Sequence, residues 1–406
     1  MNYQPETVKG FPEFLPPESQ KFEQIKDIIK NSFNNYGFLP IKTPSVEFDE
    51  LMRSSNPADE DEAVSDRFKF QDRGNRNLGL RYEFTFQLAR VFKQNPNIKL
   101  PLRRYQIGSV FRDEPTSSSR FREFTQADAD IIGDSSIEAD TECIALASNV
   151  CKSLGIESEI HINNRKLIDS ILESVKIENK KAVMRELDKL DKTGEDSVKT
   201  SLKKYADSNQ ILTLFKLLEK NLDFFVKNLF EGADEILKVS NYGKAYGFKT
   251  KFNPFLVRGL SYYTGNVFEL KIPNTKNSIA GGGRYDRVVG KYLNREIPAV
   301  GISFGIERLM DLANIPIKKI KAIVISIDSA KQSIALAENL RKENISSIVS
   351  HEKVGKSMEY ANAYEIKYAI FVGPDEIKKK KFKLKDLESG TEQELTEKQI
   401  LLKLKD

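Results

Sequence analysis

Two extended runs that lie close together in the chain constrain the fold more than any other feature. RRYQIGSVFR, at residues 103–112, and FREFTQADADIIG, at 121–133, are separated only by the polar segment DEPTSSSR. Extended runs joined by so short a polar segment are typical of an antiparallel hairpin. Because side chains alternate along a strand, one face of the second run carries residues that could line a pocket. These residues are Phe124, Gln126, Asp128 and Asp130, whereas Thr125, Ala127 and Ala129 should face elsewhere.

The charged residues of this hairpin indicate a site for a charged ligand. Arg112 and Glu114 stand at the end of the first run, and Arg120 and Arg122 begin the second. An arginine held on a strand is a rigid two-pronged donor for phosphate, and a nearby acid can hold a magnesium ion that bridges phosphates. Ion pairs on a solvated hairpin are the alternative. The aspartates on the second run need a cation, either a ligand ammonium group or a buried arginine.

Charge and composition exclude several classes of protein. The 406 residues include 64 basic and 59 acidic side chains, a net charge of +5, so any contact with nucleic acid must be local. No run of 18 apolar residues occurs, and the N-terminus has no signal-peptide pattern, so we expect a cytosolic protein. The two histidines, His161 and His351, are too few for a His/Cys zinc cluster, and neither stands beside a potential nucleophile.

Strand and helix patterns divide the chain into several regions. Residues 164–240 have helical periodicity, are rich in Lys, Asp, Glu and Leu, and interrupt a region of strand patterns. The C-terminal region alternates strands with helices, which is typical of a small parallel-sheet α/β domain. We therefore predict a core in two parts, 1–163 and 241–315, a helical insertion at 164–240, and a further domain at 319–406.

Three later segments add residues suited to binding. In RGLSYYTG, residues 258–265, the adjacent Tyr262 and Tyr263 point to opposite faces if the chain is extended, so only one should reach a site directly. The glycines of AGGGRYDR, residues 280–287, allow close approach to a ligand or another strand, or form a tight turn. Arg308 opposes the dipole at the start of a helix, which favours a bound anion, or it pairs with a neighbouring acid.

In this order, the segments resemble the histidyl-tRNA synthetase family of class II aminoacyl-tRNA synthetases. YGFLPIKTP, the hairpin segment FRDEPTSSSRFREFTQADADIIG and AVGISFGIERLM are similar to the three motifs of the class. LRYEFT at residues 80–85, RGLSYYTG and AGGGRYD are similar to signatures specific for histidine. The resemblance covers nearly the whole chain.

The resemblance implies a fold and a reaction. The fold is an α+β catalytic core with an antiparallel class II synthetase sheet, a helical insertion and a C-terminal α/β anticodon-binding domain. The reaction is that of a cytoplasmic histidine–tRNA ligase: histidine and ATP form histidyl-adenylate and pyrophosphate, and histidine then passes to the 3′ end of tRNA(His). ATP with Mg²⁺, tRNA(His) and a homodimeric assembly are implied with it.

The resemblance also implies roles for individual residues. Arg258 and Arg112 are catalytic. The histidine site comprises Glu83, Thr85, Arg112, Gln126, Asp130, Arg258, Tyr262, Tyr263 and Tyr285. The ATP site comprises Arg112, Glu114, Arg120, Phe124 and Arg308, and Arg120 and Arg122 reach the tRNA acceptor end. No metal is held by the protein alone, although Mg²⁺ bound to ATP can lie near Glu114.

One residue departs from the family pattern, and two other functions are alternatives to a histidine–tRNA ligase. Ser261 stands where the pattern RGLDYY has an acid, so the detailed role of that segment is in doubt. A catalytically silent paralogue that regulates histidine biosynthesis would lack an anticodon domain and parts of the ATP site. A synthetase of the same class for another amino acid is disfavoured by AGGGRYD and RGLSYYTG.

Overall fold

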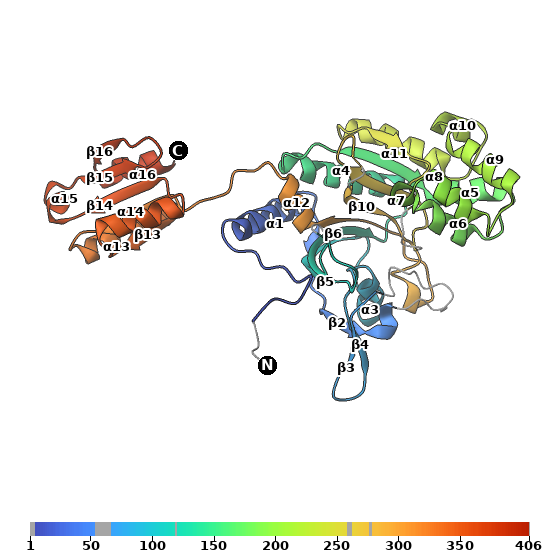
Figure 1. Cartoon of the computed structure of the whole chain (residues 1–406), viewed down its shortest axis with the longest axis horizontal. Helices are drawn as coiled ribbons and strands as arrows, with labels where there is room; N and C mark the ends of the chain where they lie inside the picture. The colour runs from blue at the N-terminus through green and yellow to red at the C-terminus, as the bar shows by residue number, and fades with distance from the viewer. Residues whose placement is uncertain (1–4, 53–65, 118–119, 258–261, 276–277, 406) are drawn as a thin grey trace. The chain divides into compact units, whose positions relative to one another are not determined.

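The protein forms two compact units, residues 1–315 and 316–406. The structure is a computed structural model that describes residues 5–52, 66–117, 120–257, 262–275 and 278–405. Within these ranges, no helix combines the length and the apolar character that crossing a membrane requires. Each unit has a sheet of its own (Figure 1).

An eight-stranded sheet is the centre of the first unit, with strand order β1-β5-β6-β11-β10-β9-β7-β8. Neighbouring strands are antiparallel, except for the pairs β1–β5 and β7–β8, which are parallel. The strands are β1 (Leu39–Pro40), β5 (Leu102–Phe111), β6 (Glu123–Ile132), β7 (Glu159–Asn164), β8 (Thr250–Phe252), β9 (Asn266–Lys271), β10 (Ser278–Arg284) and β11 (Ala299–Gly305).

The predicted hairpin is present as β5 and β6, and its alternation places the core on one side. Ala127 and Ala129 are fully buried in the main hydrophobic cluster, together with residues of three helices. These helices are α1 (Glu18–Asn35), α4 (Ile137–Ser153) and α12 (Ile306–Leu312). Their packing leaves the other face of β6 available to line a pocket (Figure 1).

The glycine run AGGGRYDR contributes to a strand rather than to a tight turn. β10 runs between β9 and β11, and a Cβ atom on Gly282 would lie 1.9 Å from the carbonyl oxygen of Gly301. No side chain fits at that distance, so the glycine is required for the close approach of the two strands. The glycines therefore lie in a strand and not in a tight turn, and Gly281, Gly282 and Gly283 also line a cavity.

Arg284, the last residue of β10, is held by a buried network. Its guanidinium donates to the carboxylate of Asp140 at 2.6 Å and to the carbonyl oxygens of Asp134 and Ser136 at 3.0 and 2.8 Å. Asp140 also accepts from Asn266 at 2.7 Å. A buried arginine with this many acceptors fixes the end of the strand and therefore the position of Tyr285, the next residue.

Helices follow β7 without an intervening strand, as predicted, and they continue to Ala245, five residues past the expected limit at 240. They are α5 (Arg165–Ser174), α6 (Lys180–Leu187), α7 (Leu190–Thr193), α8 (Glu195–Leu202), α9 (Ser208–Leu218), α10 (Leu222–Lys227) and α11 (Ala233–Ala245). Their apolar residues join the main cluster, so this region packs as part of the first unit. A small sheet of β2 (Val46–Phe48), β4 (Asn77–Leu80) and β3 (Lys69–Gln71) precedes the short helix α3 (Phe86–Gln94).

The second unit has a five-stranded sheet in the order β13-β12-β14-β15-β16. The first three strands are parallel, but β15 and β16 are antiparallel, so the expected parallel sheet is in fact mixed. The basic run at 378–385 forms part of α15 and β15. The elements are β12 (Ala322–Ser326), α13 (Ala330–Lys342), β13 (Ser347–Ser350), α14 (Val354–Ala363), β14 (Tyr368–Val372), α15 (Pro374–Lys379), β15 (Phe382–Asp386), β16 (Glu392–Leu395) and α16 (Glu397–Lys405).

Candidate active site

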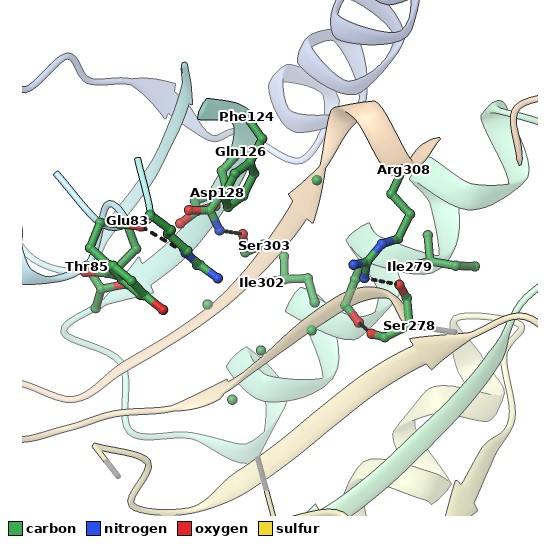
Figure 2. Close-up of a pocket in the computed structure, with 18 of the residues that line it drawn as sticks. Glu83, Thr85, Phe124, Gln126, Asp128, Ser278, Ile279, Ile302, Ser303 and Arg308 are labelled. Atoms are coloured by element: carbon green, nitrogen blue, oxygen red, sulfur yellow. Dashed lines mark hydrogen bonds between the residues drawn. The ribbon is translucent and has the colours of Figure 1, made fainter. Parts of the chain in front are cut away.

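A cavity of about 360 Å³ lies over β6, β10 and β11 in the first unit. The pocket has two chemically different ends. Figure 2 shows Phe124, Gln126 and Asp128 in a row along β6 with Glu83 and Thr85 beside them, and Arg308 on the other side of the pocket. We call the part around Glu83, Asp128 and Asp130 the acid end, and the part around Arg112, Arg120 and Arg308 the arginine end.

At the arginine end, aromatic rings and a backbone carbonyl hold the cations in place. Arg112 follows β5, and its guanidinium carbon lies 4.3 Å from the ring centre of Tyr82 and 5.0 Å from that of Phe124. Arg308 donates to the carbonyl oxygen of Ser278 at 2.7 Å. Stacking on aromatic faces positions a guanidinium and leaves its N–H groups available to a ligand.

The arginines lie close enough to repel one another. Partial burial lowers the pKa of Arg308, and the positive charges of Arg120 and Arg112 lower it further, against an opposing effect of Glu269. Arg120 also lies 3.5 Å from the carboxylate of Glu114. Mutual repulsion among three arginines favours a ligand that carries several negative charges.

At the acid end, three carboxyl groups are almost fully buried around one arginine. Glu83, Asp128 and Asp130 are 4%, 5% and 3% exposed, and Arg104 on β5 is 0% exposed. An oxygen of Asp130 lies 2.6 Å from the guanidinium of Arg104, which stands directly opposite it in the hairpin register. The acid end therefore contains more potential negative charges than positive charges.

The pKa values of these carboxyl groups follow from their surroundings. Burial raises the pKa of Glu83, although hydrogen bonds from Thr85 and from the backbone N–H of Phe86, at 2.6 Å, oppose this. The hydrogen bond to Phe86 also satisfies an N–H in the first turn of α3, which fixes the Glu83 side chain. Burial and the nearby charge of Asp130 raise the pKa of Asp128 to about 8. Burial raises the pKa of Asp130, against the opposing effect of Arg104.

Tyrosines close the acid end, and one prediction about them is wrong. The hydroxyl of Tyr285 donates to the carboxylate of Asp130. Tyr262 and Tyr263 both line the pocket, with ring centres 4.8 Å apart, although alternation along an extended chain would have placed only one of them there. The alternation does not apply because both residues precede β9, in a turn and a loop.

The cavity brings together most of the residues that the sequence indicates. Thirteen of them line it: Glu83, Thr85, Arg112, Glu114, Arg120, Phe124, Gln126, Asp128, Asp130, Tyr262, Tyr263, Tyr285 and Arg308. Arg122 is not among the lining residues; it lies 3.3 Å from the carboxylate of Asp113 and donates to the carbonyl oxygen of Glu114. Arg258 and Ser261 lie outside the described residues.

Sequence reasoning missed three contributors to the site. It expected a cation beside the aspartates without identifying Arg104, although counting outward from the hairpin loop places Arg104 opposite Asp130. Tyr82 was not singled out; its ring lies under Arg112 and its hydroxyl donates to Glu114 at 3.2 Å. Ser303, whose hydroxyl oxygen accepts from Gln126 at 2.7 Å, carries no signal in the sequence because it depends on the pairing of β6 with β11.

The protein provides few groups for a metal ion. In the part of the chain that the structure describes, no three acidic, histidine or cysteine side chains are grouped as metal ligands. Glu114 contributes one carboxylate at the arginine end. One carboxylate suits a Mg²⁺ ion whose remaining ligands are phosphate oxygens and water.

Comparison with known proteins relates this geometry to a family. The chain matches the family model for histidyl-tRNA synthetase over residues 10–309 and that for an anticodon-binding domain over residues 320–406. It is 35% identical to histidine–tRNA ligase 1 of Bacillus cereus, an alignment that covers 95% of this chain and 94% of the relative. It is 33% identical to histidine–tRNA ligase of Clostridium tetani, with 97% and 96% covered.

Solved structures show the same fold. Histidyl-tRNA synthetase from Nostoc sp. PCC 7120 superposes with a TM-score of 0.88 at 27% identity, covering 100% of this chain and 99% of the other. An ATP phosphoribosyltransferase regulatory subunit/histidyl-tRNA synthetase from Bacillus halodurans superposes at 0.75 with 22% identity, covering 91% and 99%, and at that identity it shows the fold alone. The predicted class II fold with a C-terminal anticodon-binding domain is thus confirmed, and the chain belongs to the histidyl-tRNA synthetase family.

Proposed function

We propose that the protein is a histidine–tRNA ligase that uses ATP and releases AMP and pyrophosphate. The observation that carries the proposal is the division of one pocket into an acid end and an arginine end on a continuous strand floor. An amino acid brings an ammonium group, and ATP brings a triphosphate. A pocket with both kinds of side chain can hold the two substrates side by side.

The reaction proceeds in two steps. A carboxylate oxygen of histidine forms a bond to the α-phosphorus of ATP, and pyrophosphate leaves with the electrons of the broken P–O bond. A hydroxyl of the terminal ribose of tRNA(His) then attacks the carbonyl carbon of the adenylate, and AMP leaves. Neither step requires a covalent bond to the enzyme, so the protein acts through positioning and electrostatic stabilisation.

The residues of the arginine end suit the nucleotide. Arg112 and Arg258 stabilise the charge that develops at the α-phosphate, Phe124 stacks on the adenine, and Arg308 holds the γ-phosphate. Arg112 and Arg308 both line the pocket, which supports this assignment. Removing one well-placed donor of this kind costs about 3–4 kcal/mol of transition-state stabilisation. Glu114 would hold a Mg²⁺ ion bound to ATP, and the ion would neutralise phosphate charge there.

The residues of the acid end suit histidine. Glu83, Thr85, Gln126 and Asp130 receive the ammonium group and fix the substrate, and Tyr263 and Tyr285 line the imidazole site with Tyr262 beside them. Their burial supports selectivity, because another amino acid would leave buried polar groups unpaired. Such a penalty reaches roughly 10⁴–10⁵-fold.

The tRNA contacts are assigned to two regions. Arg120 and Arg122 on the hairpin reach the acceptor end, and residues 319–406 read the anticodon loop, consistent with the match of that region to an anticodon-binding family. The division into a core at 1–163 and 241–315 with an insertion at 164–240 is part of this proposal.

Deletion of residues 316–406 should leave adenylate formation within about twofold, because that unit has its own hydrophobic clusters. Charging of tRNA should fall by at least about 100-fold, and loss of both activities would contradict the assignment.

We further propose that the protein is a homodimer and works in the cytoplasm, where translation takes place. The edge strand β1 and the edge strand β2 of the small sheet carry exposed apolar side chains: Leu39 is 61% exposed and Phe48 is 52% exposed. Apolar residues on an unpaired strand edge favour association. Light scattering should report a dimer that Leu39→Glu weakens; a monomeric wild type would contradict the proposal.

Exchange of pyrophosphate into ATP tests the function directly. We expect exchange to depend on histidine and to be absent with other amino acids. A regulatory paralogue that binds histidine without activating it would show none, and exchange driven by another amino acid would assign a different substrate.

A further inference from the structure

Asp128 lies on the floor of the pocket, yet the assignment above gives it no role. It stands on β6 between Gln126 and Asp130, lines the cavity and is only 5% exposed. Figure 2 shows its side chain in the row with Gln126, beside Glu83. Among the residues that the structure describes, its Oδ1 atom has no hydrogen-bond partner. An unpaired buried oxygen in a binding pocket points to a ligand that provides a donor.

Arg104 and Ser303 favour a charge on Asp128, but burial and the charge of Asp130 outweigh them. The nearest cation, Arg104 on β5, lies 2.6 Å from Asp130. Gln106 and Ser303 stand opposite Asp128 on the neighbouring strands. Gln106 is paired with Thr43 at 3.2 Å, whereas Ser303 accepts from Gln126 at 2.7 Å and also forms a hydrogen bond with Asp128 that lowers the pKa of Asp128. Asp130 and Glu83 are both acidic. The described surroundings therefore provide one guanidinium for three carboxyl groups.

This imbalance decides which form of Asp128 is present in the free protein. Two carboxylates so close together in a buried site cannot both be ionised at low cost. Burial and the charge of Asp130 raise the pKa of Asp128 to about 8. At neutral pH most molecules therefore carry a proton on Asp128, and a second cation in the pocket would reverse this preference.

We propose that Asp128 is a further substrate-binding carboxyl group, which receives a cationic nitrogen of the amino acid and releases its proton to solvent as the amino acid binds. In this step the O–H bond of Asp128 breaks, the proton passes to water or buffer, and the carboxylate pairs with the cation. The proposal rests on the proposed function, because histidine supplies the cation. The α-ammonium and a protonated imidazole are two sources of the same chemistry, and ligand analogues distinguish them.

Calorimetry of histidine binding measures this proton directly. Titrations at pH 7 in two buffers of different ionisation enthalpy should show release of about 0.9 proton per histidine bound, from linkage with a pKa near 8. Affinity should rise about eightfold between pH 7 and pH 8.5, because fewer molecules must lose a proton on binding. Asp128→Asn has nearly the same shape but no titrating group. This variant should release less than half as many protons per histidine bound, and its affinity for histidine should not rise between pH 7 and pH 8.5. Ionisation of free histidine is common to both proteins and cancels in the comparison.

A matched control and two analogues sharpen the test. Glu123→Gln removes a carboxylate from the same strand at a position that does not line the cavity, so it should release as many protons as the wild type. Histamine keeps the ammonium group, and 3-(imidazol-4-yl)propionate lacks it. Release with histamine but not with the propionate identifies the α-ammonium, and release with both analogues identifies the imidazole that they share.

The outcomes separate this inference from the proposed function. Histidine binding with equal proton release in the wild type and Asp128→Asn would overturn the inference and leave the function standing. Absence of histidine binding by the wild type would overturn both. If Asp128→Asn does not fold, by circular dichroism, the wild type still decides: proton release should disappear at pH 9.5, and release that persists there contradicts the inference.

Discussion

The two ends of the pocket present opposite electrostatic problems. At the acid end, Glu83, Asp128 and Asp130 are almost fully buried around Arg104. At the arginine end, Arg120 and Arg308 both reach solvent, although partial burial lowers the pKa of Arg308. In the free protein, water stabilises the charges at the arginine end. At the acid end, a carboxylate must be paired with a cation of the protein or be neutralised by a proton.

This difference explains how one strand floor can serve two purposes. Solvated arginines remain charged at any physiological pH and lose little stability while they wait for an anion. A buried carboxylate without a matching cation raises the free energy of the folded protein. A ligand that lacks the matching cation leaves this cost in place, so the site selects the ligand that removes it. We therefore expect mutations at the acid end to change stability and selectivity, and those at the arginine end to change rate.

The largest effect should follow from removing the buried cation. Arg104→Leu leaves Asp130 without its partner, so we expect the free energy of unfolding to fall by about 3–5 kcal/mol in urea denaturation. Arg112→Ala, at the other end, should change it by less than about 1 kcal/mol, because this side chain is only partly buried. Similar losses for both substitutions would remove the distinction between the two ends.

Arg112→Ala should instead affect the rate. We expect histidine-dependent pyrophosphate exchange to slow by about 100-fold or more, because this group stabilises charge that develops in the transition state. Arg103→Ala is the matched control, since Arg103 is on the same strand and forms an ion pair with Glu142 at 2.7 Å outside the pocket. A rate close to that of the wild type in Arg112→Ala would exclude Arg112 from the catalytic residues.

The stability of the ligand-free protein should depend on pH through the acid end. The pKa of Asp128 is about 8 in the folded state, against an ordinary value of 3.8, so the folded state binds a proton that the unfolded state releases. This contribution is complete at low pH and is lost as the pH rises toward 8. Between pH 6 and pH 7.5, the wild type should lose up to about 1.4 kcal/mol per pH unit relative to Asp128→Asn. Parallel pH profiles would show that Asp128 is not protonated.

The smallest effect concerns a single hydroxyl group. Tyr285→Phe removes the hydrogen bond to Asp130 and keeps the ring. A lost hydrogen bond to a charged group costs about 1.5 kcal/mol of stability, so the free energy of unfolding should fall by about that amount in urea denaturation. An unchanged free energy of unfolding would mean that this hydrogen bond does not stabilise the folded protein.

Local patterns were sufficient to predict the hairpin and much of the site. The turn segment between two extended runs predicts the pairing of β5 with β6, and alternation places Phe124, Gln126, Asp128 and Asp130 on one face; both are confirmed. The resemblance to a known family supplied the residues that come from distant segments. Periodicity alone would not have brought Arg308 to the same pocket as Arg112.

Contacts between distant strands and irregular backbone limited the rest. Alternation failed for Tyr262 and Tyr263 because they precede β9 in a turn and a loop. Ser303 contributes only through the pairing of β11 with β6, which no local pattern predicts. The reversal of direction at β15 was missed because local sequence does not determine whether an added strand is parallel or antiparallel.

A crystal structure of the protein with histidine and a non-hydrolysable ATP analogue would test the division of the pocket most directly. We expect the histidine ammonium group beside Glu83 and Asp130, a cationic nitrogen of histidine against Asp128, and the triphosphate against Arg112 and Arg308. The histidine carboxylate should face the α-phosphorus. Substrates bound with these ends reversed, or in separate cavities, would contradict the account.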